Sequence, residues 1–186
     1  CIVLGEGEAT AVELFRALEE KNSISDINGI AFRDEQGNFR SNPRNPLIED
    51  LDTIAWPAYH LFPMEYYRLM KVENQSDTEF SIPMMSARGC TFKCTFCYRM
   101  DPGFRARSGE ALLDEVEYLY KEYKITRFSF MDDLLMSSVE HTEEVCAAFE
   151  KRNIPVTWDC NGRLNYCSPE LLNRMKRAGC VFINYG

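Results

Sequence analysis

Three cysteines lie close together near the middle of the sequence, at positions 90, 94 and 97. Their C-x3-C-x2-C spacing puts three sulfurs on one short loop, directly behind an apolar run (residues 80–85) that predicts a β-strand. Thiolates gathered this tightly repel one another, and taking one uncompensated charge out of water costs on the order of several kcal/mol. A soft cation relieves this repulsion, because thiolates prefer zinc or iron–sulfur clusters to hard ions. The loop is therefore predicted to hold a metal centre.

The number of ligands distinguishes the kinds of centre that such a loop can hold. A structural zinc site needs four ligands, and no fourth Cys or His stands near this loop. A thioredoxin-like C-x-x-C pair (Cys94 and Cys97) leaves Cys90 unexplained, and a ferredoxin needs a fourth cysteine for each cluster. A four-iron cube held by three cysteines keeps one iron without a protein ligand, so that corner can bind a substrate or cofactor.

The residues around the cysteines resemble the C-x3-C-x-Φ-C signature of the radical S-adenosylmethionine (SAM) enzymes, in which Φ is aromatic. Phe96 stands at the aromatic position, Arg88-Gly89 precedes the first cysteine and Tyr98-Arg99 follows the last. The resemblance implies a [4Fe-4S] cluster whose free iron is chelated by the amino and carboxylate groups of SAM, with Phe96 at the adenine. The implied metal ligands are Cys90, Cys94 and Cys97.

The activity implied by this resemblance is reductive cleavage of SAM to a 5′-deoxyadenosyl radical, which abstracts hydrogen from a substrate. An external electron donor of the flavodoxin or ferredoxin type supplies the electron. A cobalamin-dependent methyltransferase, or a related enzyme that functionalises C–H bonds, is the expected kind of protein; the sequence names neither the substrate nor a catalytic side chain. Two alternatives stay open, namely an iron–sulfur electron-transfer or sensing module without SAM chemistry and an inactive truncated fragment.

Composition limits the partners of the chain. Its 186 residues carry a net charge of −8, which argues against a broad nucleic-acid footprint. No apolar run approaches the roughly 18–20 residues of a membrane span. Apart from the cluster of three, the cysteines are scattered, which favours a reducing cytoplasm over a disulfide framework.

From residue 79 onward, strands and helices alternate. Helices are predicted from residue 108 or 109 to about 123, over about 138–152, and from Ser168-Pro169 to Gly179. In the first of them Glu115 is expected to face solvent, and His141 is expected to be exposed in the second. Alternation with crossover helices predicts a parallel sheet wound right-handedly. The fold class is therefore α/β, a partial (β/α) barrel of the radical SAM type comprising about half of the barrel.

The chemistry in such barrels lies at the carboxyl ends of the strands. The second strand ends in Asp132 and Asp133, where many members of the resembled family carry a Gly-Gly-Glu stretch that meets the SAM amino group; either carboxylate could accept from that ammonium. The third strand is followed by Arg163, whose planar fork suits bidentate binding of the SAM carboxylate. Cys160 and Cys167 are expected to be core or loop thiols rather than metal ligands.

The first residues predict a strand, a glycine turn and a helix. Residues 1–4 are apolar, like a strand buried on both faces of a parallel sheet. Val12, Phe15 and Leu18 recur at helical spacing over residues 9–21, and Leu14 and Ala17 widen this stripe. Ahead of the cysteine signature, this unit resembles the last βα unit of a Rossmann-like cobalamin-binding domain, whose remainder is expected upstream of Cys1. The resemblance implies contact with the corrin's nucleotide tail by Gly5, Glu6 and Gly7.

A hairpin and a linker follow this unit. Residues 30–33 and 38–40 flank a turn and predict a small β-hairpin. Four prolines between residues 42 and 63 predict an extended linker whose aromatic residues, Trp56 and Tyr59 among them, pack on the barrel. The predicted organisation is a cobalamin-domain remnant with hairpin (1–41), a linker (42–78) and the first half of a radical SAM barrel (79–186).

Overall fold

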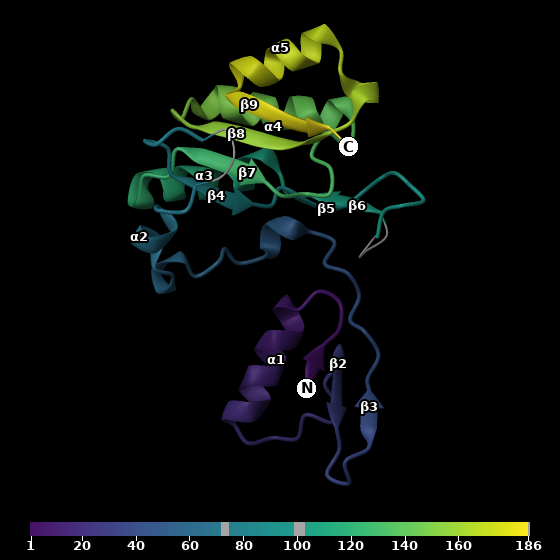
Figure 1. Cartoon of the computed structure of the whole chain (residues 1–186). Helices are drawn as coiled ribbons and strands as arrows, with labels where there is room; N and C mark the ends of the chain where they lie inside the picture. Colours follow the sequence, from purple (N-terminus) through teal and green to yellow (C-terminus); the bar gives the residue numbers. More distant parts are fainter. Residues whose placement is uncertain (72–74, 99–102, 186) are drawn as a thin grey trace. The chain divides into compact units, whose positions relative to one another are not determined.

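The computed structural model describes residues 1–71, 75–98 and 103–185. Within the described residues the chain forms two compact units, Cys1–Glu49 and Asp50–Gly186, which Figure 1 shows in purple to dark blue and in blue to yellow. Arg99, which the sequence resemblance includes, lies outside the described residues.

The first unit consists of one helix and three antiparallel strands. Strand β2 pairs with β1 on one side and with β3 on the other. The predicted hairpin is confirmed, because the Asp34 carboxylate accepts hydrogen bonds from the backbone N–H groups of Gln36 and Asn38 and so closes the turn. The elements are β1 (Ile2–Val3), α1 (Glu8–Glu19), β2 (Ile30–Arg33) and β3 (Phe39–Ser41).

One prediction for the first unit is wrong. Ile2 in β1 is 62% exposed, and this strand pairs antiparallel with β2 rather than lying between parallel neighbours. The predicted helix is confirmed as α1; of its apolar stripe Leu14 is buried, together with Thr10, whereas Val12, Phe15 and Leu18 are exposed. The three-stranded sheet is too small to cover both sides of the helix and the outer face of β1.

The second unit is built on a parallel four-stranded sheet in the order β4-β7-β8-β9. Helices α3, α4 and α5 connect its strands, with α3 packed against α4 and α4 against α5 (Figure 1). The elements are α2 (Met64–Tyr67), β4 (Ser81–Met84), β5 (Ala87–Gly89), β6 (Phe104–Ala106), α3 (Gly109–Tyr123), β7 (Arg127–Phe130), α4 (Val139–Arg152), β8 (Thr157–Gly162), α5 (Pro169–Arg177) and β9 (Cys180–Tyr185). This α/β arrangement confirms the predicted partial (β/α) barrel.

Serine caps explain where the three crossover helices begin. Ser108, Ser138 and Ser168 are extended N-cap residues, and each side chain accepts a hydrogen bond from a backbone N–H in the first turn. Pro169 at the start of α5 fits because the first helical position needs no N–H donor. These signals are local, which is why the helix starts could be predicted closely.

The core of the second unit lies between the sheet and its helices. Trp158, Phe128 and Phe130 are buried at the centre, and Phe149 of α4 stacks on Trp158 with ring centroids 5.4 Å apart. Among the described residues, no helix is long and apolar enough to cross a membrane.

Two polar residues of the crossover helices lie deeper than predicted. Glu115 is only 3% exposed, because it accepts hydrogen bonds from Tyr59 and Arg107. His141 is half-buried against the ring of Phe104, 5.2 Å between centroids, and burial lowers the pKa of this histidine. The predictions that Glu115 faces solvent and that His141 is exposed are therefore wrong.

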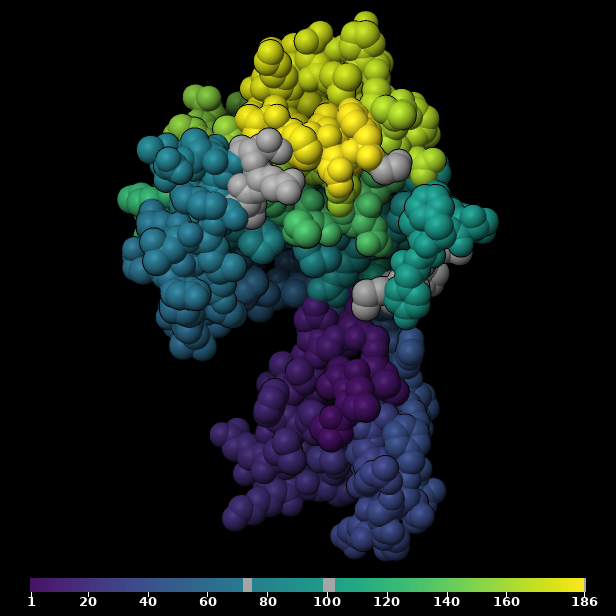
Figure 2. All heavy atoms as spheres, viewed as in Figure 1, coloured from purple at the N-terminus to yellow at the C-terminus, as the bar shows by residue number. Residues whose placement is uncertain are grey.

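A β-hairpin that the sequence did not predict holds the cysteine loop. Strands β5 and β6 pair antiparallel, with Gly89 opposite Phe104, and the segment between them carries the three cysteines. The hairpin extends beyond the parallel sheet in Figure 1, and its teal atoms stand out at the side of the unit in Figure 2.

Candidate functional site

The cysteine loop begins at the end of β5, the first strand of the hairpin. Gly89, just before Cys90, has φ of +77°, a conformation that an L side chain strains. This accounts for the glycine in Arg88-Gly89. Thr91 of the loop donates a long hydrogen bond, 3.5 Å, to the carbonyl of Ser137, which belongs to the buried segment after β7.

The three sulfurs are free thiols near one another. Cys90 and Cys94 are half-buried and Cys97 is exposed. Partial desolvation raises the pKa of Cys97, and the nearby sulfurs of Cys94 and Cys90 and the carboxylate of Asp133 raise it further. A cationic centre would reverse this effect, because it stabilises the thiolate form.

The donor set fits a cluster better than a single ion. In residues 1–71, 75–98 and 103–185, no three His, Cys, Asp or Glu side chains lie close enough to hold one metal ion. An iron–sulfur cube spaces its thiolates further apart, because each thiolate binds a different iron. Three soft donors on one loop match a cube with one open corner.

Asp132 ties the entrance of the cysteine hairpin to the end of β7. Its carboxylate accepts hydrogen bonds from the backbone N–H groups of Ser86 and Ala87, at 2.8 and 3.0 Å, and from the Ser86 hydroxyl. Burial raises the pKa of Asp132 to about 6, although these three hydrogen bonds oppose the shift. The group is 1% exposed, so its carboxylate faces protein donors.

The other predicted site residues surround the loop. Asp133 is exposed beside Cys97, and Phe96 is 84% exposed. Arg163, directly after β8, donates from Nη1 to Cys94 Sγ at 3.3 Å. The structure thus brings a carboxylate and a guanidinium to the cysteines from two neighbouring strand ends.

The parallel strands deliver these groups because their carboxyl ends meet at one edge of the sheet.

A family model described as the radical SAM superfamily matches residues 84–186, more than half of the chain. The chain belongs to this superfamily. The cysteine loop and the elements from β5 to β9 lie within the matched residues.

Individual relatives of this radical SAM chain match nearly its whole length. It is 30% identical over 188 residues to a Pyrococcus horikoshii protein named an uncharacterized methyltransferase, covering 100% of this chain and 39% of that protein. It is also 30% identical over 192 residues to the anaerobic magnesium-protoporphyrin IX monomethyl ester cyclase of Rubrivivax gelatinosus, covering 100% and 34%. The chain therefore spans about two fifths of the length of such relatives or less.

A solved structure shares the fold. The cobalamin-dependent SAM radical enzyme OxsB, solved with aqua-cobalamin and SAM bound, superimposes with a TM-score of 0.75 at 18% identity. The match covers 98% of this chain and 27% of that one.

Two asparagines that were not predicted as site residues form a row along the same edge of the sheet. Asn161 Nδ2 donates to the main-chain carbonyl of Asp132 at 2.9 Å. Asn184 Nδ2 in turn donates to Asn161 Oδ1 at 3.2 Å. This row of amides joins the ends of β7, β8 and β9, and the only sequence signal for it is the position of each asparagine near the end of its strand.

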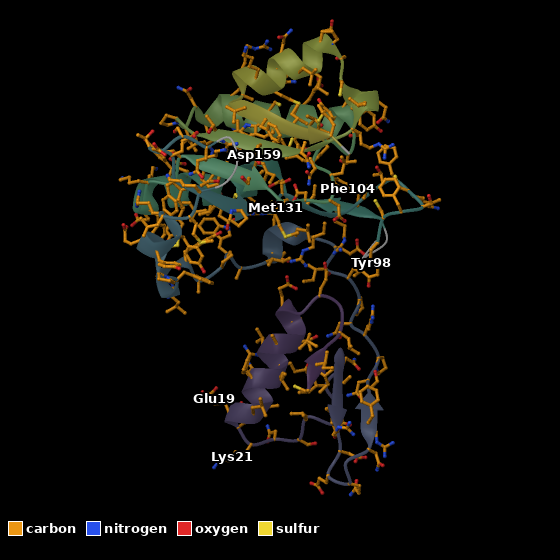
Figure 3. All side chains as sticks on the ribbon, viewed as in Figure 1. Glu19, Lys21, Tyr98, Phe104, Met131 and Asp159 are labelled. Atoms are coloured by element: carbon orange, nitrogen blue, oxygen red, sulfur yellow. The ribbon has the colours of Figure 1, made fainter. Side chains whose placement is uncertain are left out.

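The sequence analysis also did not predict an ion pair between the neighbouring strands β7 and β8. Arg127 Nε donates to Asp159 Oδ2 at 3.0 Å, and the Ser129 hydroxyl donates to the same oxygen at 3.0 Å. Figure 3 labels Asp159 on β8 and Met131 at the end of β7. Because strand residues two apart share a face, Arg127 and Ser129 present one polar face of β7 to Asp159.

The glycine turn of the first unit has the backbone that its sequence predicts. Gly5 has φ of +80°, and Gly7 is the N-cap of α1. The Glu6 carboxylate accepts a hydrogen bond from the backbone N–H of Ile48 at 2.7 Å. The cysteine loop lies in the other unit, so these three residues are described apart from it.

Proposed function

We propose that this protein is a radical SAM enzyme whose cluster is held by Cys90, Cys94 and Cys97 and whose reaction is methyl transfer with cobalamin. The observation that carries the proposal is the loop of three cysteines at the carboxyl edge of a parallel βα sheet. When bound there, a reduced [4Fe-4S] cluster supplies the electron that cleaves SAM to a 5′-deoxyadenosyl radical.

We assign different tasks to the two adjacent aspartates. The Asp132 carboxylate already accepts from Ser86 and Ala87, so its task is to fix the entrance of the cysteine hairpin. Asp133 is exposed beside Cys97 and is the better acceptor for the SAM ammonium. This divides a role that the sequence left to either residue.

Two further residues would contact SAM. Arg163 lies at the neighbouring strand end, and its planar guanidinium suits the SAM carboxylate. Phe96 precedes the last cysteine with 84% of its surface exposed, so a large apolar face is available to the adenine.

The cobalamin part of the proposal rests on the first unit. The turn of Gly5, Glu6 and Gly7 leads from β1 into α1, and its glycines let a ligand approach the backbone closely. Val12, Phe15 and Leu18 present an exposed apolar stripe on α1, which suits the edge of a larger domain. On this proposal Gly5, Glu6 and Gly7 lie near the nucleotide tail of the corrin.

The enzyme needs an external reductant, because a cluster of this kind must gain an electron before each cleavage. We propose a small flavodoxin- or ferredoxin-type donor and a cytoplasmic location. The substrate is a small molecule whose class the described residues do not specify.

The test is anaerobic reconstitution of the chain with iron and sulfide, followed by SAM and dithionite. We expect about four irons per chain, a cluster spectrum that changes when SAM binds, and release of 5′-deoxyadenosine. A cluster whose spectrum ignores SAM would instead favour an electron-transfer or sensing module. A chain that holds iron only weakly and releases no 5′-deoxyadenosine would favour an inactive fragment.

A second candidate is ring formation. The 30% identity to a magnesium-protoporphyrin IX monomethyl ester cyclase favours it, since that relative matches this chain over its whole length. Supplying methyl-labelled SAM to the full-length protein distinguishes the two, because only methyl transfer moves the label into the product.

A further inference from the structure

The guanidinium of Arg163 makes three contacts, two of them with residues of the cysteine loop. Its Nη1 lies 3.3 Å from Cys94 Sγ, and its central carbon lies 3.9 Å from the centre of the Phe92 ring. Nε donates to Asn165 Oδ1 at 3.2 Å. A long, flexible side chain with three such contacts occupies one position, with its charge directed at a sulfur.

The backbone around Arg163 supports this position. Its carbonyl accepts hydrogen bonds from the Tyr166 N–H at 3.1 Å and from the Cys167 thiol at 3.2 Å, which closes a short turn. The Tyr166 ring packs near Phe92, 6.0 Å between centroids. Phe92 therefore contacts the guanidinium and also lies against the turn that carries it.

We propose that Arg163 donates a charge-assisted hydrogen bond to the Cys94 sulfur of the cluster and thereby raises the cluster's reduction potential. This inference rests on the proposed function, because it needs Cys94 to be a cluster ligand. Arg163 then has two roles: it binds the SAM carboxylate, and it acts on the cluster even before SAM is bound.

The direction of the effect follows from charge. Reduction adds one negative charge to the cluster, and a positive guanidinium in contact with a ligand sulfur stabilises the reduced state more than the oxidised state. Hydrogen bonds to the sulfurs are among the features that set the potential of such clusters. The cation–π contact with Phe92 holds the guanidinium in place. The desolvation cost of the guanidinium in this contact is smaller than it would be in a fully buried position.

The test is the midpoint potential of the reconstituted [4Fe-4S] cluster, measured by a redox titration followed by electron paramagnetic resonance without SAM. Arg163→Met removes both charge and donor, and we expect a more negative potential than in the wild type. Arg163→Lys keeps the charge but loses the planar contact, so its potential should lie between these two. Phe92→Leu frees the guanidinium and should give a smaller shift in the same direction.

Arg177→Met is the matched control, because it removes the same charge from an exposed residue at the end of α5. That helix end leads into the start of β9, at the edge opposite the cysteines. We expect its potential to equal the wild-type value, which excludes a general effect of net charge.

The outcomes distinguish the inference from the function beneath it. A wild-type chain that assembles no cluster would overturn both. A cluster whose potential is the same in the wild type and in Arg163→Met overturns the inference alone; if that variant also binds SAM weakly, only the carboxylate role survives. Where Arg163→Met assembles no cluster, wild-type potentials in both Arg163→Lys and Phe92→Leu overturn the inference.

Discussion

Asp132 shows how a single buried carboxylate can fix the geometry of the site at a cost in stability. Because burial raises its pKa to about 6 from 3.8, the folded protein holds a proton there that the unfolded chain releases at lower pH. Stability from this group is therefore greatest below pH 3.8 and falls as pH rises to about 6. At pH 7 the charged form costs roughly 3 kcal/mol relative to an unperturbed aspartate.

We predict that Asp132→Asn removes this pH dependence. The amide oxygen can still accept from both backbone N–H groups, and the amide nitrogen can donate to the Ser86 hydroxyl. Urea unfolding between pH 4 and 7 measures the free energy of unfolding of both proteins. The variant should become increasingly more stable than the wild type as pH rises. Asp132→Ala is the contrasting variant, because it leaves two buried donors unsatisfied at about 1–3 kcal/mol each. A constant difference between Asp132→Asn and wild type across this range would contradict the raised pKa.

The cysteines of the loop and those of the core should affect the cluster differently. Cys94→Ser should abolish the visible absorption of the reconstituted cluster, because one iron loses its soft ligand. Cys146→Ser is the matched control, since Cys146 lies fully buried in α4, away from the loop. An equal loss of absorption in both variants would show that the ligand assignment is wrong.

At the scale of elements, the base of the cysteine hairpin is held by a buried carboxylate of α3. Glu115 accepts from the Tyr59 hydroxyl at 2.6 Å and from Arg107, which follows β6. Arg107 also donates to the carbonyl of Ala111 at 3.0 Å. The segment before the barrel, the hairpin and the first crossover helix therefore meet at one carboxylate.

We predict that removing the Glu115 carboxylate destabilises the protein more than removing the Tyr59 hydroxyl. Glu115→Ala leaves the Arg107 charge poorly compensated in a nearly buried position and should cost about 3–5 kcal/mol. Tyr59→Phe loses one hydrogen bond and should cost about 1–2 kcal/mol. Chemical unfolding of each variant and of the double variant measures their coupling. Additive costs would mean that Tyr59 and Glu115 act independently.

Elements whose signals are local could be predicted from the sequence, and elements that depend on distant partners could not. The serine caps and the alternating pattern gave the crossover helices and the parallel sheet. Glu115 reads as a solvent-facing position because its partners, Tyr59 and Arg107, come from other elements. The β5–β6 hairpin was missed because Phe104–Ala106 is short and gains its strand character only by pairing with Ala87–Gly89.

The same distinction holds for the candidate site. The cysteine spacing alone predicts a soft metal centre, and Arg163 was chosen as a site residue for its chemistry and its place after a strand. Its contact with Cys94 could not be predicted, since it depends on how the β8 end approaches the loop. Asn161 and Asn184 carry no distinguishing sequence pattern, and only the register of β8 and β9 aligns them.

At the scale of the whole molecule, the two units differ greatly in the cores that hold them together. The first unit buries only Leu14, Ile27 and Ile30 in its apolar cluster. The second buries a continuous cluster that runs from Met64 to Cys180. Since small units bury a smaller fraction of their surface, the first has little stability of its own.

We therefore predict that residues 50–186 fold and bind the cluster without residues 1–49. All the hydrogen bonds described above for the cysteines, Asp132 and Arg163 arise within the second unit. The shortened chain should show a cooperative unfolding transition and, after reconstitution, the same cluster absorption per chain as the full sequence. Residues 1–49 alone should lack a cooperative transition, because so small an apolar cluster cannot offset the conformational entropy of the segment. A shortened chain that folds but assembles no cluster would mean that the first unit contributes directly to the cysteine site.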